Sequence, residues 1–132
     1  MIAKNIVTQL KIISAITSIF WTNIYAWSKF KMQSWKFLVV SPLTTDSYRE
    51  LTEIWPLSNR YPYSFMMVGE MSTTENTMFW YLETLTEELW VWCGMLHSFG
   101  WVTVHRLQRG TVSPVVYNQE RPVLTADFTF IV

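Results

Sequence analysis

Apolar residues at the start of the chain recur at every third or fourth position, which is the spacing of one face of an α-helix. They are Ile2, Ile6, Leu10, Ile13, Ile16 and Phe20. Lys4, Lys11 and Ser18 fall largely outside this stripe. The pattern therefore predicts an amphipathic helix that packs its apolar side on a core.

A second helix is predicted in the middle of the chain. Its start signal is Ser72-Thr73-Thr74-Glu75, which has the form of a capping box: a hydroxyl and a carboxylate three residues later satisfy backbone N–H groups of the first turn. Apolar residues then recur by three or four positions, and these are Met78, Leu82, Leu85, Leu89, Cys93 and Leu96. Glu83, Glu87 and Glu88 indicate the solvated side of the helix.

Three tryptophans of this helix do not fit one core. Trp80, Trp90 and Trp92 lie beside or opposite the apolar stripe, so the apolar surface is wider than the helix can bury in its own domain. We therefore expect these side chains to contact a neighbouring subunit.

Four runs rich in β-branched and aromatic residues predict strands. They are Trp35–Val40, Tyr61–Gly69, Trp101–Gln108 and Val123–Val132, the last with clear alternation. Pro62 places the start of the second run at an edge or a bulge, because proline cannot donate to a sheet ladder. Residues 24–33 are interpreted as a connection, and the polar stretch 44–59 has room for one helical turn.

The predicted elements follow in the order α-β-β-α-β-β. This order is typical of an α+β fold, in which two helices pack on one face of a mostly antiparallel four-stranded sheet. The chain has 132 residues, of which 50% are hydrophobic and 15% charged, a composition that excludes intrinsic disorder. We expect a single domain over residues 1–132.

The charges cancel overall but are separated along the chain. Residues 1–36 have five lysines and no acidic residue, whereas residues 37–99 have eight acidic residues and two arginines. Two such halves can neutralise each other on folding, or they can pair head to tail between copies of the chain. The eight tryptophans, too many for one small core, also favour contact between subunits.

The best candidates for catalysis or metal binding are Cys93 and His97, four residues apart on the second helix, with His105 nearby in sequence. Zinc needs three or four ligands, and cysteine–histidine catalysis needs a third orienting group. Cys93 is more simply interpreted as a small core residue, and the glutamates of the helix as a solvated face. Because no phosphate-binding or nucleophile motif occurs either, we predict no enzymatic activity, no metal and no cofactor.

Two segments have features of membrane or nucleic-acid binding. Residues 12–27 are apolar after two lysines, but polar residues interrupt the run, and a spanning helix needs about 20 predominantly apolar residues. Lys29, Lys31 and Lys36 alternate with aromatic residues, Trp27, Phe30 and Trp35, which is suitable chemistry for single-stranded nucleic acid. Three lysines are more often simply exposed, so we expect no specific nucleic acid as partner. Because the apolar run is interrupted, we expect no membrane as partner either.

The connection Arg109–Pro122 is long for a hairpin turn. Gly110 and Pro114 disfavour regular strand, while the apolar residues that follow would be exposed on an isolated loop. We expect a docking element outside the core; the alternative is an extended hairpin in which Val115 and Val116 pack on their own sheet. The predicted interface is Trp80, Trp90, Trp92, Arg109, Val115, Val116 and Tyr117.

Four segments resemble the tail-terminator and tail-completion proteins of long-tailed bacteriophages. They are Ile6-Val-Thr-Gln-Leu-Lys-Ile-Ile-Ser-Ala-Ile-Thr-Ser-Ile, Asn23-Ile24-Tyr25, Phe37-Leu38-Val39-Val40-Ser41 and Tyr61-Pro62-Tyr63. The order of the elements, with a second helix and a final alternating strand, is similar to the same group.

The resemblance implies a structural virion protein of the phage tail or neck, assembled in the host cytoplasm and without an active site. Such terminators form rings, usually hexamers, that cap the tail tube and join it to the head-side connector. The implied partners are further copies of the chain, the tail-tube protein and the head-completion or connector protein. Two alternatives remain: a head-side stopper or joining protein of the neck, and a small membrane-associated lysis-type protein that uses the N-terminal helix.

Overall fold

The computed structural model describes residues 3–27, 34–43, 60–94, 98–99, 102–103 and 106–131. The helices are α1 (Ala3–Leu10), α2 (Ser14–Phe20) and α3 (Glu75–Gly94). The strands are β1 (Ile24–Ala26), β2 (Phe37–Pro42), β3 (Arg60–Val68), β4 (Ser98–Phe99), β5 (Val102–Thr103), β6 (Arg106–Val112), β7 (Val116–Asn118) and β8 (Arg121–Ile131).

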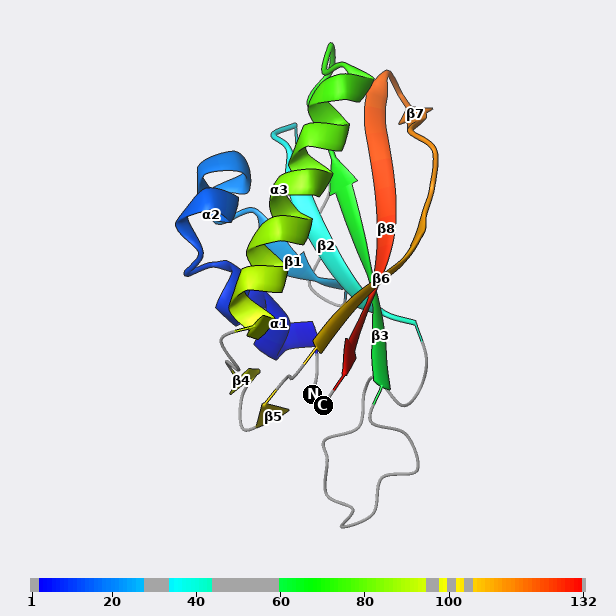
Figure 1. The fold of residues 1–132 in the computed structure, drawn as a ribbon. Helices are drawn as coiled ribbons and strands as arrows, with labels where there is room; N and C mark the ends of the chain where they lie inside the picture. Colours follow the sequence, from blue (N-terminus) through cyan, green and yellow to red (C-terminus); the bar gives the residue numbers. More distant parts are fainter. Residues whose placement is uncertain are drawn as a thin grey trace.

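Six strands form one sheet in the order β1-β2-β3-β8-β6, and β7 pairs with the first residues of β8. The pair β1–β2 is parallel, and the other pairs are antiparallel. Strands β4 and β5 form a separate two-stranded sheet. The three helices lie together on one face of the large sheet, with α3 across its middle (Figure 1). The fold is therefore mixed α/β, with the predicted separation of helices and sheet into two layers.

The sheet has more strands than predicted. The four predicted runs correspond to β2, β3, β6 and β8, although Trp101–Gln108 covers both β5 and the start of β6. Residues 24–26 form β1 instead of a connection. Strand β7, which follows β6 and precedes β8 in the chain, is a further addition to the sheet. Both added strands have three residues, too few to show a period in the sequence.

The core lies between the helices and the sheet. Alternate residues of β8 are buried, as predicted: Leu124, Ala126, Phe128 and Phe130. On β3, Phe65 packs edge-to-face on Phe128 with ring centroids 5.2 Å apart, and Tyr63 packs on Phe130 at 5.9 Å. Burial raises the pKa of Tyr63 above its ordinary range, because the charged phenolate would lose its water.

The predicted N-terminal helix is in fact two helices. Residues 11–13 break it, and Ile13 has extended backbone angles (φ −87°, ψ 110°) before α2 begins. Two β-branched residues followed by a serine disfavour helix at this point. The bend keeps the apolar stripe on the core, because Ile6, Leu10, Ile16 and Phe20 are all buried.

Helix α3 confirms the predicted core stripe from Met78 to Leu89 but not its cap; the side chain of Cys93 and all of Leu96 lie outside the described residues. Met78, Leu82, Leu85 and Leu89 are buried, each by 98% or more. The N-terminal cap is Thr74, whose Oγ1 accepts a hydrogen bond from the backbone N–H of Thr77 at 3.3 Å. The predicted capping box beginning at Ser72 is wrong by two residues, because the chain still turns at Ser72, where φ is 75°.

Strand β3 lies inside the sheet, but its start, where Pro62 lies, extends beyond the end of β2, in agreement with the predicted position at an edge. Strand β2 ends at Pro42, opposite Tyr63, and Pro62 therefore has a ladder partner, Thr129, on the β8 side alone. The carbonyl of Pro62 accepts a hydrogen bond from the N–H of Leu43 at 3.2 Å. The proline is tolerated because it lies just beyond the end of its neighbouring strand.

The opposite face of the sheet has a smaller apolar cluster. Phe37, Val39 and Val68 are buried there, with Tyr25, Met66 and Val123 packed partly against them. Among the described helices, none combines the length and the apolar character needed to span a membrane.

Candidate subunit interface

Helix α3 exposes large apolar side chains on the side away from the core. Trp80 is 59% exposed and Trp90 57%, and Phe79 and Val91 are also exposed. Glu83 and Glu87 lie between the two ends of this surface. The outward side of α3 is therefore apolar at both ends and acidic in the middle.

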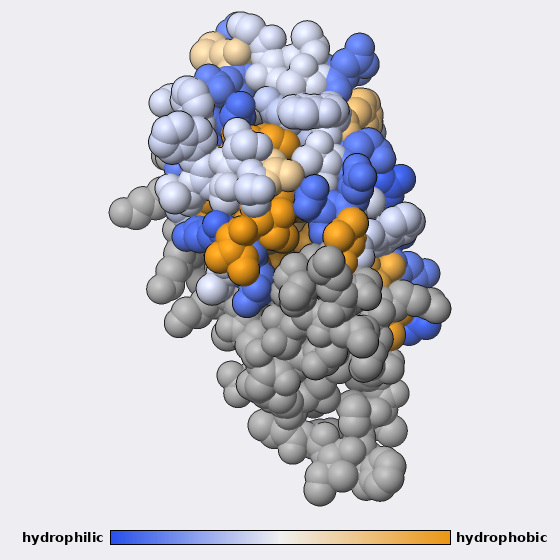
Figure 2. Space-filling model, turned by 60° about the vertical axis from the view of Figure 1, so that its left-hand side comes forward, coloured by the Kyte–Doolittle hydropathy of each residue, from blue (hydrophilic) through white to orange (hydrophobic). Residues whose placement is uncertain are grey.

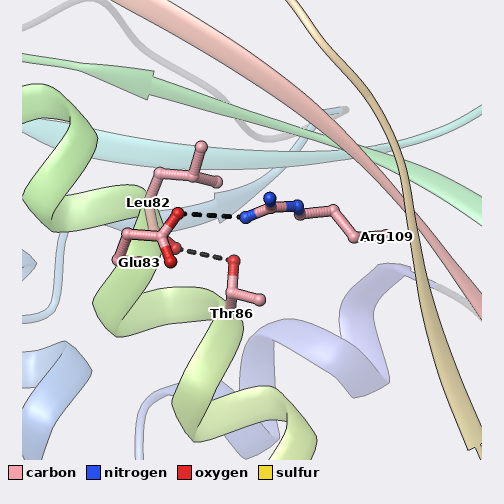
Figure 3. Close-up of polar contacts among 4 residues, drawn as sticks. All are labelled: Leu82, Glu83, Thr86 and Arg109. Atoms are coloured by element: carbon pink, nitrogen blue, oxygen red, sulfur yellow. Dashed lines mark hydrogen bonds and ion pairs between the residues drawn. The ribbon is translucent and has the colours of Figure 1, made fainter.

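An ion pair connects this helix to the strand at the edge of the sheet. Arg109 extends from β6 across to α3, where its guanidinium lies 3.1 Å from the carboxylate of Glu83 (Figure 3). Both side chains are exposed, so the pair contributes only about 0–1 kcal/mol to stability. Its main effect is to fix the position of two charged side chains beside the outward surface of α3.

One turn further along, the hydroxyl of Thr86 is buried and donates a hydrogen bond to the carbonyl of Leu82 at 2.8 Å (Figure 3). Beside it the surface is hollowed. This open hollow has a volume of about 270 Å³, and the described residues that line it are Glu83, Thr86, Glu87, Trp90 and Val91. It could accept an apolar side chain of a partner next to the indole of Trp90.

The segment 109–122 is paired along much of its length. Strand β6 continues through Gly110 to Val112, with a register irregularity after Arg109, and β7 pairs with β8. Ser113 connects the segment to Thr125, whose carbonyl accepts from the N–H of Ser113 at 2.8 Å. The expectation of an unpaired loop is therefore wrong, because the strand follows β8 past the glycine.

The side chains of this hairpin divide between core and surface. Val115 packs against the core, whereas Val116 is 58% exposed and Tyr117 53%. The alternative hairpin interpretation is thus confirmed for Val115 and wrong for Val116. The docking role of the segment stays a prediction.

The predicted interface residues are not all on one surface. Trp90 and Arg109 both lie near Glu83: Trp90 lines the same hollow, and Arg109 forms the ion pair. Val116 and Tyr117 belong to β7, which pairs with β8, the neighbour of β6 in the sheet. Trp80 lies near the other end of α3, where its ring is 5.5 Å from that of Tyr81. The side chain of Trp92 lies outside the described residues.

A second exposed surface lies at the two ends of α2 and was not predicted. Ile12 is 71% exposed and Trp21 66%, the largest values among the exposed large apolar side chains described. Figure 2 turns the side that carries α2 towards the reader and shows apolar side chains gathered in its middle. The sequence had one signal of this surface: Ile12 is apolar but falls outside the helical stripe.

Lys36 is used within the fold. Its Nζ donates to the hydroxyl of Tyr81 at 3.4 Å and lies over the rings of Trp35, at 5.7 Å, and Tyr81, at 5.4 Å. Lys29, Phe30 and Lys31 lie outside the described residues. Lys36 therefore has an intramolecular role, and the nucleic-acid alternative loses one of its three lysines.

The side chain of Cys93 and all of His97 and His105, the candidates for metal binding or catalysis, lie outside the described residues. In the remaining described part of the chain, no three His, Cys, Asp or Glu residues are grouped so that they could hold a metal ion.

The chain matches no protein-family model, and no curated protein is significantly similar to it in sequence.

Proposed function

We propose that the protein is a structural virion protein of a long-tailed bacteriophage, a tail terminator that forms a ring on the tail tube and joins it to the head connector. The ring is expected to have six copies, to assemble in the host cytoplasm and to need no cofactor. The sequence resemblance described above is the first support for this role.

The fold is compatible with that resemblance. The expected order α-β-β-α-β-β corresponds to the helix pair α1–α2, then β2, β3, α3, β6 and β8. Strands β1 and β7 extend the common sheet on its two sides.

The observation that carries the proposal is the presence of two separate apolar surfaces. One lies on α3 and includes Trp90; the other lies at the ends of α2 and includes Ile12 and Trp21. A ring is closed by heterologous contacts, in which one surface of a subunit meets a different surface of the next. Large apolar side chains gathered on a surface are typical of protein–protein contact sites, which supports this arrangement.

The proposal is tested with purified protein and with tail tubes that lack their terminator. Sedimentation should show a particle of about six times the monomer mass, and negative-stain electron microscopy should show a ring at one end of each tube. Binding to head connectors but not to tubes would replace the proposal with the stopper role. Protein that is soluble only in detergent would replace it with the membrane-associated role.

A further inference from the structure

We infer that the contact between neighbouring subunits joins the α3–β6 flank of one copy to the α1–α2 corner of the next. The α3–β6 flank consists of Phe79, Glu83, Glu87 and Trp90 on α3 together with strand β6. The α1–α2 corner consists of Lys11 and Ile12, which connect the two helices, and of Trp21, which directly follows α2. This inference rests on the proposed ring and assigns the two surfaces that build it.

The two surfaces belong to opposite sides of the subunit. Within the described residues, the large sheet begins at β1 and ends at β6. The α1–α2 corner leads directly into β1, because Trp21 is three residues before Ile24. The α3–β6 flank lies at the other end of the sheet, where Arg109 connects the two elements. Joining one to the other therefore repeats in a single direction, as a ring requires.

The apolar parts of the two surfaces complement each other. Ile12 and Trp21 are exposed at the two ends of the short helix α2. On the opposite flank, Phe79 and Trp90 are exposed at the two ends of a stripe along α3. Each surface thus presents two large side chains separated by a helical segment, and burying them against each other would remove all four from water.

The charges also complement each other. Residues 1–36 contain five lysines and no acidic residue, and Lys11 is exposed at the corner. Helix α3 contains four glutamates and no basic residue, and Glu83 and Glu87 face outward between Phe79 and Trp90. A symmetric contact of α3 with α3 would instead bring the two glutamate-rich stripes together. Electrostatics therefore favour pairing of the flank with the corner.

The backbone at Trp21 gives an independent reason to assign this residue a role. The N–H of Asn23 donates to the carbonyl of Phe20 at 2.9 Å, which closes a turn with Trp21 at its second position. Trp21 has φ 54° and ψ −131°, angles of a type II′ turn that favour glycine at this position. Backbone strain at an exposed side chain is typical of functional positions, which supports a contact of Trp21 outside its own subunit.

Charge reversal tests the contact through Lys11 and Glu87; Glu83 is left unchanged because it already pairs with Arg109. Lys11→Glu and Glu87→Lys should each raise the concentration of half-assembly by about tenfold or more, and the double variant should restore assembly. A 1:1 mixture of the two single variants should also assemble, because each flank then meets a corner of opposite charge. Sedimentation velocity measures all four samples, and circular dichroism checks that each variant is folded.

Glu88→Lys is the matched control. It makes the same change one residue further along the same helix, on the side that turns towards α2 and away from β6. Its assembly should equal that of the wild type.

The outcomes separate this inference from the proposed function. If the wild type forms rings and folded Lys11→Glu and Glu87→Lys variants assemble equally well, the surfaces are wrongly assigned while the ring stands. Failure of the double variant and of the mixture to recover has the same meaning. A wild-type protein that stays monomeric, with and without tail tubes, overturns the ring itself.

Discussion

Arg121 covers Phe37 on the face of the sheet opposite the helices. The guanidinium carbon lies 5.4 Å from the centre of the phenyl ring, and Phe37 is fully buried. The same guanidinium donates to the carbonyls of Gly69 and Trp35, each at 2.9 Å. One side chain at the start of β8 therefore connects three segments and closes the smaller apolar cluster.

Replacing Arg121 with lysine should lower the free energy of unfolding by about 1–2 kcal/mol, because an ammonium cannot make both hydrogen bonds and stack on the ring. Urea denaturation measures the change as a lower midpoint with an unchanged slope. Arg109→Lys is the control, since the ion pair of Arg109 is exposed and its loss should change stability by less than about 1 kcal/mol. Equal effects of the two variants would show that the cover over Phe37 is unimportant.

The turn between β7 and β8 is a site for stabilisation. Gln119 (φ 52°) and Glu120 (φ 65°) both have left-handed backbone angles, as a type I′ turn requires, but neither is a residue that favours them. The double change Gln119→Asn and Glu120→Gly should raise the free energy of unfolding by about 1 kcal/mol. Asn118→Gly, one residue earlier in β7, should not stabilise, and thermal unfolding compares the two. A gain from both variants would contradict the turn type.

The long periodic elements could be predicted from the sequence because their residues alternate between two environments. In β8, Phe128 and Phe130 face the helices while Asp127 and Thr129 face the other side. The same is true of α3, where the spacing of Leu82, Leu85 and Leu89 corresponds to one buried face. In these elements the local pattern and the final packing agree.

The elements that could not be predicted depend on partners far away in the sequence. Strand β1 forms because Ile24–Ala26 pair with Leu38–Val40. A segment of three residues has no pattern from which such a pairing could be predicted. The cap of α3 involves a choice among adjacent hydroxyl residues, and the turn at Ser72 decides it in favour of Thr74. Of the candidate interface, Trp90 was predicted from its place off the stripe. Trp21 was not predicted, although it also falls outside the stripe, which ends at Phe20.

Two substitutions in α3 should have different effects, one on folding and the other on assembly. Leu85 is 1% exposed, so Leu85→Ala should lower the free energy of unfolding by about 2–5 kcal/mol through lost burial and a cavity. Trp90→Ala should change subunit stability by about 0.5 kcal/mol or less, because the side chain is mainly exposed, but it should weaken assembly. Urea denaturation and sedimentation are the two measurements. Loss of helical circular dichroism in Trp90→Ala, with no change in particle size, would show that Trp90 serves the core instead.

Replacing Trp21 with glycine should stabilise the subunit but weaken its assembly. Glycine adopts the backbone angles of Trp21 without strain, so Trp21→Gly should raise the free energy of unfolding of the subunit by about 1 kcal/mol. The same change removes the exposed indole and should weaken assembly. Trp21→Ala is the matched control: it removes the indole but keeps a side chain at the left-handed position, so assembly should fall without the gain in stability. Thermal unfolding of the dissociated subunit and sedimentation at a fixed concentration give the two readings. If both variants assemble like the wild type, the strained tryptophan is not a contact between subunits; if Trp21→Gly destabilises the subunit, the indole stabilises its own fold.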